Sequence, residues 1–236
     1  MSIEVEIRRT NRQKSVAFEV RLPNTMIVSA PRRLPAGTIR QLAEERLEWA
    51  AKRLRAIETA YARHGLPKRF SGGETFSYLG QDILLTIIVA TGSTRSRVEL
   101  TGERLLITIR AVPEEAQADL VRAALLKWYK SAASQCLDAA VERWAPVVGA
   151  QPKAVKVRNQ RRRWGSCSHD GSLNFNWRLV MAPADILDYV VVHELCHLRE
   201  PNHSKRYWDL VARAMPEHAQ HRKWLKDNAV LLESCV

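Results

Sequence analysis

The 236-residue sequence has little cysteine, no long apolar run and no glycine-rich nucleotide signature. The four cysteines are Cys136, Cys167, Cys196 and Cys235, and none of them forms a CxxC pair. This spacing argues against a disulfide framework and against a cysteine-based zinc site. It fits a protein of a reducing compartment. No stretch of about 18 apolar residues is present, so we expect no membrane span. The N-terminus alternates apolar and charged residues and lacks the apolar core of a signal peptide, so we expect a cytoplasmic protein. Without a P-loop or a dinucleotide-binding glycine pattern, a nucleotide-binding fold is disfavoured.

Positive charge is concentrated at the start of the chain. The formal net charge is +12, and residues 1–69 carry 15 Lys and Arg against 7 Asp and Glu, a balance of +8. Such a bias permits weak, non-specific attraction to nucleic acid or another polyanion. A basic surface with no specific partner is the simpler explanation, because the sequence contains no recognised nucleic-acid-binding motif. Nothing in the sequence indicates an oligomeric state.

Two groups of strands, each followed by a helical pattern, make up the first two thirds of the chain. Alternating apolar residues predict strands near 3–7, 16–22 and 26–30, and again between 78 and 109. A repeat of three and four residues predicts a helix over 38–63. Pro113, followed by two acidic residues, begins a long helix that should end near Trp144. We therefore predict an N-terminal β-rich region with one long helix over 1–112 and a second domain over 113–236.

A hairpin and an amphipathic helix follow the long helix. Residues 154–158 suggest a strand, and His169-Asp170-Gly171-Ser172 is a hairpin turn signal. Leu173–Leu179 alternates apolar and polar residues, as a strand with one buried face does. Pro183 then starts a helix. Two aromatic residues of this region are interpreted as core, Trp164 and Trp177.

The helix after Pro183 carries His193-Glu194-Leu195-Cys196-His197. Two His four residues apart lie about 40° apart around an α-helix, so both imidazoles can reach one metal ion. Glu194 lies about 80° to one side, where it can reach a metal-bound water. In this pattern two His hold zinc and the Glu is the general base. The face of the helix away from the two His is apolar and is interpreted as buried; it carries Val191, Leu195 and Leu198. Cys196 is interpreted as a small core hydrophobe.

A third protein ligand is expected, because catalytic zinc takes three protein ligands and leaves the fourth position for water. Leu198 and Arg199 can continue the helix, and Pro201 ends it. Asn202 favours a turn, so the chain can fold back and present His203 to a zinc ion. Two residues on a later helix are the alternative third ligands, Glu217 and His218.

The same part of the chain resembles a known family. The resemblance rests on Arg163-Trp164-Gly165-Ser166-Cys167-Ser168, on Leu173–Leu179, on the helix Leu187–Leu198, and on Asn202-His203-Ser204 followed by Trp208. These residues are similar to those of the YgjP-like metallopeptidases, which are themselves similar to the SprT and WLM zinc peptidases. The specific motifs cover residues 158–224, and weaker similarity continues over most of the chain.

This resemblance implies an α+β protein whose C-terminal domain is zincin-like, with a β-hairpin beside the HExxH helix. It also implies that His193, His197 and His203 bind Zn²⁺ and that Glu194 is catalytic. Cys196 stands where the family more often has a small residue such as Ala. The resemblance gives a reaction class and no particular substrate.

The leading functional hypothesis is zinc-dependent hydrolysis of a peptide bond in a protein or peptide substrate. Glu194 would take a proton from water and pass it to the leaving amine. The polar edge of the Ser166–Asn176 hairpin could hold an extended peptide by strand addition, although the hairpin could equally be structural support for the helix. The candidate substrate contacts are Arg163, Ser166 and Asn176.

Three alternatives remain open at this point. A run of arginines before the hairpin suits phosphate, which would favour a metal-dependent nucleotide or phosphoester hydrolase; these are Arg158, Arg161, Arg162 and Arg163. The basic N-terminal region would suit a DNA-associated protease. A non-catalytic, zinc-stabilised binding module is the third alternative, and Glu194 argues against it because a structural zinc site does not need a general base.

Overall fold

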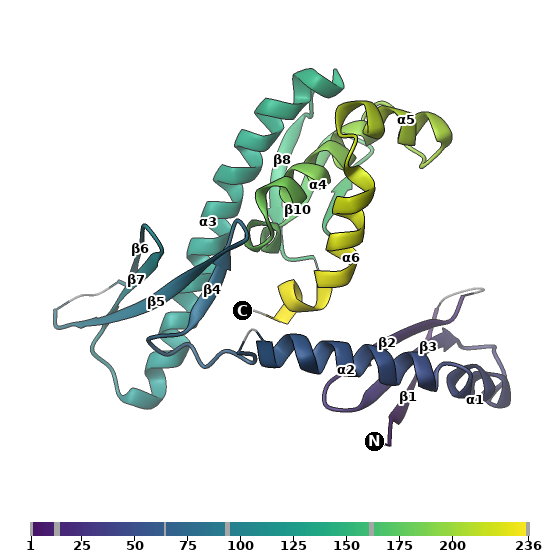
Figure 1. Cartoon of the computed structure of the whole chain (residues 1–236), viewed down its shortest axis with the longest axis horizontal. Coiled ribbons are helices and arrows are strands. Elements are labelled where there is room, and N and C mark those ends of the chain that lie inside the picture. The colour runs from purple at the N-terminus through teal and green to yellow at the C-terminus, as the bar shows by residue number, and fades with distance from the viewer. Residues whose placement is uncertain (1, 12–14, 64, 93–94, 161–162, 235–236) are drawn as a thin grey trace. The chain divides into compact units, whose positions relative to one another are not determined.

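The protein is a mixed α+β molecule, as the sequence predicts (Figure 1). The computed structural model describes residues 2–11, 15–63, 65–92, 95–160 and 163–234. Contacts divide the chain into two compact units, Met1–Leu66 and Pro67–Val236. The predicted boundary at residue 112 differs from this division, because the strands that precede it belong to the core of the second unit.

The first unit is a three-stranded sheet with two helices. Its strands are β1 (Glu4–Thr10), β2 (Ala17–Arg21) and β3 (Thr25–Pro31), and its helices are α1 (Ala36–Glu44) and α2 (Leu47–Arg63). The strand order is β1-β3-β2, with β1 parallel and β2 antiparallel to β3. The central strand supplies Met26, Val28 and Ala30 to a small core, and α1 supplies Ile39 and Ala43. The single helix predicted over 38–63 is thus two helices.

The second unit begins with a four-stranded sheet on one long helix. The strands are β4 (Thr75–Tyr78), β5 (Gln81–Ala90), β6 (Arg97–Thr101) and β7 (Arg104–Arg110), in the order β4-β5-β7-β6. Alternate residues such as Ile83 and Leu85 are buried in one core with α3 (Glu114–Val148). The helix continues past the predicted end at Trp144, and Pro146 lies within its last turns. It ends where Gly149 adopts a left-handed conformation at φ 68°.

The C-terminal part builds the region of the HExxH motif. A three-stranded sheet has the order β8-β10-β9 and places β9 at one edge; its strands are β8 (Ala154–Arg158), β9 (Gly165–Cys167) and β10 (Ser172–Asn176). The predicted strand Leu173–Leu179 ends early, because the Asn176 side chain accepts a hydrogen bond from the Arg178 backbone and starts the 3₁₀ helix η1 (Trp177–Met181). Three helices follow, α4 (Ala184–His197), α5 (Lys205–Ala214) and α6 (His218–Ser234).

Helix α4 is central to this part of the second unit. It contacts α3, α5, α6 and β9 (Figure 1). The turn before β5 packs against its start, since a Cβ atom at Gly80 would lie 2.9 Å from the Pro183 Cα atom. The position of α4 is therefore fixed by neighbours on several sides, and the side chains that it presents are held on a rigid element.

Candidate metal centre

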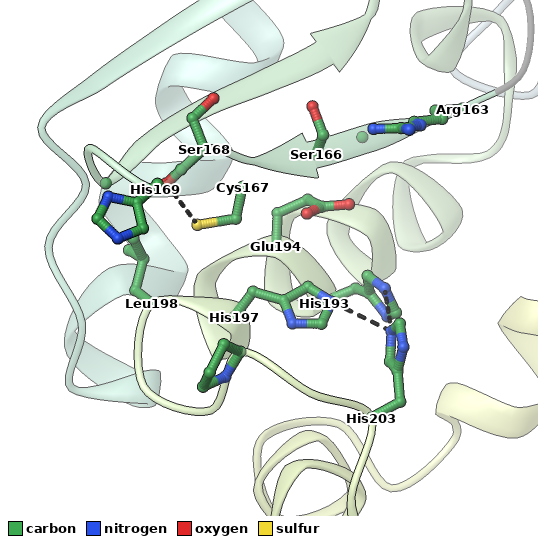
Figure 2. A pocket seen from close by; sticks show the side chains of 13 residues that line it. Arg163, Ser166, Cys167, Ser168, His169, His193, Glu194, His197, Leu198 and His203 are labelled. Carbon is green, nitrogen blue, oxygen red and sulfur yellow. Dashed lines mark hydrogen bonds between the residues drawn. The ribbon is translucent and has the colours of Figure 1, made fainter.

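Helix α4 supplies two imidazoles on one side and core residues on the other. Val191, Leu195 and Cys196 are fully buried, as the sequence predicts. The predicted position of Leu198 needs correction. The helix ends at His197, so Leu198 lies in the following turn, where it contacts the core and also lines the pocket above the histidines (Figure 2).

Three imidazoles converge at the end of α4. The Nε2 atom of His203 lies 3.1 Å from that of His197 and 3.3 Å from that of His193 (Figure 2). Tetrahedral zinc with bonds of about 2.0–2.1 Å places its ligand nitrogens about 3.3 Å apart. The two distances from His203 therefore match the spacing that a single zinc ion requires, and the ligand atoms of all three residues lie within 4.8 Å of one another.

The environment of these rings keeps their nitrogens available to a metal. The Nδ1 atom of His197 lies 3.2 Å from the Glu200 carbonyl oxygen, so that Nδ1 carries the proton and Nε2 keeps its lone pair. Burial first, and then the charges of His197 and His203, lower the pKa of His193 to about 3. Burial also lowers the pKa of His197. Neutral imidazole is the form that binds a metal ion.

The alternative third ligands lie elsewhere. His218 stacks on Trp208, and its Nδ1 atom lies 3.1 Å from the Met215 carbonyl oxygen. Glu217 is exposed just before α6. Within the part of the chain that the structure describes, the one group of His, Cys, Asp or Glu that could hold a metal is His193, His197 and His203.

Glu194 lies between the histidines and the edge strand β9 (Figure 2). The side chain is only 4% exposed. Burial raises the pKa of its carboxyl to about 8, although a hydrogen bond from the Cys167 backbone and the charge of Arg163 act in the opposite direction. A carboxyl with such a pKa can accept and release a proton near neutral pH.

Gly165 is a site residue that the pattern of the sequence does not predict. A Cβ atom at this position would come within 2.6 Å of both Cγ and Oε1 of Glu194. The Glu194 carboxyl therefore occupies the space that a side chain at this position of β9 would fill. The one signal in the sequence was a glycine outside any turn, immediately before the hairpin and within the family motif.

A pocket of about 480 Å³ opens above these residues. Two of the three residues predicted to contact substrate line it, Arg163 and Ser166. Asn176 does not line it. The Asn176 side chain is 2% exposed, and its amide donates hydrogen bonds to the carbonyl oxygens of Gln160 and Arg163. The Asn176 side chain therefore links the backbones of Gln160 and Arg163 and does not face the pocket.

The arginine run divides between several environments. Arg163 faces the pocket, whereas Arg158 is exposed on β8 and does not line it. Arg161 and Arg162 lie outside the described residues. The phosphate-binding alternative therefore rests on Arg163 alone among the residues that the structure places.

Residues 14–228 match the family model described as "YgjP-like, metallopeptidase domain". The chain belongs to the YgjP-like metallopeptidase family. None of the curated proteins matches it. A solved structure, the metallopeptidase zymogen of Pyrococcus abyssi abylysin, is similar over 38% of this chain and 92% of that chain, with 21% sequence identity and a TM-score of 0.35.

The two tryptophans of this YgjP-like protein that the sequence predicts to be core, Trp164 and Trp177, lie outside the pocket. Trp177 is 1% exposed, and its Nε1 atom donates a hydrogen bond to Asn159. Trp164 is half-buried against the same core, and neither residue lines the pocket.

Among the described helices, none is long and apolar enough to cross a membrane.

Proposed function

We propose that this YgjP-like protein is a zinc-dependent peptidase. In this proposal His193, His197 and His203 hold Zn²⁺, and Glu194 is the general base. The observation that carries it is the convergence of the three Nε2 atoms, at 3.1 and 3.3 Å, beside a buried carboxyl. When bound, zinc supplies polarisation of the scissile carbonyl and a water of lowered pKa.

The chain's own groups divide the remaining work. The buried Glu194 carboxyl takes a proton from the attacking water and passes it to the nitrogen of the leaving amine. Burial raises the pKa of this carboxyl in the metal-free protein, and a Zn²⁺ ion held by the neighbouring imidazoles would lower that pKa toward the ionised form that takes up a proton. Gly165 lets the carboxyl lie close against β9, so that its position is fixed by packing.

Strand β9 offers a place for an extended peptide. It is an edge strand, paired on one side with β10, and Gly165, Ser166 and Cys167 all line the pocket. An unpaired strand edge presents N–H and C=O groups that can pair with another extended chain. Arg163, at the start of this edge, is positioned to attract acidic groups of the substrate.

A second candidate is a metal-dependent phosphoester hydrolase, which the position of Arg163 in the pocket favours. The same catalytic residues would serve it, and only the substrate would differ.

We also retain two proposals from the sequence: a cytoplasmic location, from the cysteine pattern, and weak nucleic-acid binding, from the basic N-terminal residues.

The test compares the wild-type protein with Glu194→Gln. We expect about one zinc per chain in both, and a rate of casein cleavage at least about 10²-fold lower in the variant, the usual size of a general-base contribution. Release of phosphate from phosphoesters, with casein left intact, would favour the second candidate. A variant with intact zinc and the wild-type rate would show that Glu194 is not the base.

A further inference from the structure

His203 differs from the other two imidazoles in how it is held. His193 and His197 extend from α4, and both are half-buried. His203 comes from the short segment between α4 and α5, and its side chain is exposed. A ring on an exposed connection has more orientations available than a ring on a packed helix, so its direction must be set by what it touches.

The His203 ring stacks on the indole of Trp208. The two ring centroids are 5.6 Å apart, and the ring planes are inclined by 21°, which is an offset stack. Trp208 belongs to α5 and lies four residues after Ser204, whose side chain caps the start of that helix. The stack therefore joins the loop ligand to a regular element.

Helix α6 holds the indole in turn. His218 stacks on Trp208 with centroids 5.9 Å apart and planes inclined by 25°. The Cζ atom of Arg222 lies 5.0 Å from the indole centroid, within the range of a cation–π contact. Both residues belong to α6, which also packs against α4.

The residue before Trp208 makes a similar contact. Tyr207 stacks on His197 at 4.5 Å and 24°, and its hydroxyl donates a hydrogen bond to the His193 carbonyl oxygen. Tyr207 also makes edge contacts with the rings of His203 and His193, at centroid distances of 4.8 and 5.4 Å, whereas Trp208 is the α5 residue that stacks flat on the His203 ring. Tyr207 is fully buried in the main core, whereas Trp208 is only partly buried at its margin.

We propose that Trp208 is the positioning residue for the third metal ligand. Its indole, held by His218 and Arg222, fixes the His203 ring so that Nε2 faces the Nε2 atoms of His193 and His197. The proposal rests on the proposed ligand set. Outer partners of a ligating histidine usually change metal affinity by about 10–100-fold when removed, and we expect Trp208 to act in this range.

The test measures metal binding and needs no substrate. Zinc dissociation constants are determined by competition with a chromogenic chelator for the wild type, Trp208→Leu and Trp208→Phe. The control is Trp224→Leu, because Trp224 lies on α6, is partly buried against the same core, and makes no ring contact with the three imidazoles. Cobalt-substituted samples of each protein report ligand geometry through their visible absorption.

We expect Trp208→Leu to bind zinc about 10–100-fold more weakly and to change the cobalt spectrum. Trp208→Phe, which keeps an aromatic face, should recover most of the affinity, and Trp224→Leu should bind as the wild type does. If Trp208→Leu does not fold, Trp208→Met takes its place, since Met fills irregular space without a flat ring. Wild-type affinity and spectrum in the Leu or Met variant would overturn the proposal.

A double-mutant cycle separates positioning from general destabilisation. If Trp208 acts through His203, then Trp208→Leu weakens zinc binding in the wild type but not further in a His203→Ala background. Equal weakening in both backgrounds would mean that the indole does not act through that imidazole, and would overturn the proposal. If His203→Ala alone binds zinc as tightly as the wild type, the ligand set of the proposed function is wrong instead.

Discussion

Gly165 and Glu194 are in such close contact that the smallest possible side chain on one would displace the other. A Cβ atom at Gly165 would lie 2.6 Å from Oε1 of Glu194 and 2.9 Å from its Cδ atom. The backbone of Gly165 needs no unusual conformation, since its φ is not positive. The glycine is therefore required by space, and the space is that of the proposed general base.

The first prediction concerns this contact. Gly165→Ala should lower the peptidase rate by about 10²-fold, because a displacement of about 1 Å at a catalytic group has an effect of this size. Zinc content should stay close to that of the wild type, since the imidazoles are on another side of Glu194. The measurement is the hydrolysis rate together with metal analysis. Gly72→Ala is the matched control, because a Cβ at Gly72 meets nothing within 4 Å.

A wild-type rate in Gly165→Ala would contradict this prediction, because it would show that Glu194 keeps its function when moved. Loss of zinc in the same variant would indicate instead that the Glu194 carboxyl contributes to holding the metal.

The second prediction distinguishes the possible third ligands. His203→Ala should lose most of its bound metal, because its Nε2 atom is the one that lies close to both other imidazole nitrogens. Glu217→Ala should keep its metal, since Glu217 is outside the cluster. Metal analysis of both purified variants gives the answer. Retention in the first and loss in the second would move the ligand to Glu217.

Much of this site could be predicted from local sequence. The spacing of His193 and His197 needs only the period of an α-helix, and Pro201 followed by Asn202 correctly predicts that the chain turns back. The structure then brings His203 to the other two imidazoles. The family resemblance is confirmed by the match over residues 14–228.

The features that escaped prediction depend on contacts between distant segments. No periodicity places Gly165 against Glu194, because one is on β9 and the other is on α4. The Trp208 stack needs α6 as well as α5. Asn176 alternates correctly with its neighbours, yet its side chain is satisfied by loop carbonyls and does not reach the pocket.

Some predicted boundaries of helices and strands were wrong for local reasons that the hydrophobic pattern cannot show. The Asn176 side chain ends β10 by capping η1, which turns the following apolar residues from a strand into a 3₁₀ helix. Pro146 is accommodated in the last turns of α3, so that Gly149 is what ends the helix. The break between α1 and α2 leaves apolar residues at mixed three- and four-residue steps, which also fit one continuous helix.

The third prediction concerns nucleic acid. Binding of the full chain to duplex DNA should be weak, independent of sequence and steeply salt-dependent, because residues 1–69 carry a balance of +8 without a base-reading motif. A titration with two unrelated duplexes at low and moderate salt measures this. Tight binding that survives moderate salt, or a clear preference for one duplex, would reveal a specific reader.

The last prediction follows from the raised pKa of Glu194 in the metal-free protein. Burial raises the pKa of this carboxyl to about 8 in the folded chain, against an ordinary value of 4.5. Below about pH 4.5 both states hold the proton, and the group has no effect on stability. Between about pH 4.5 and 8 the folded state holds the proton while the unfolded state has released it, so this group lowers the free energy of unfolding as pH rises.

Glu194→Gln cannot titrate, and the variant should therefore gain stability relative to the wild type as pH rises through this window. The measurement is urea unfolding of both proteins with chelator present, at several values from about pH 4.5 to about pH 8. Comparing the two proteins at each pH removes the common contribution of the histidines. Glu142→Gln, at an exposed position on α3, controls for the loss of a carboxyl in general. A stability difference between Glu194→Gln and the wild type that does not change with pH would mean that the Glu194 carboxyl is already charged in the folded, metal-free protein.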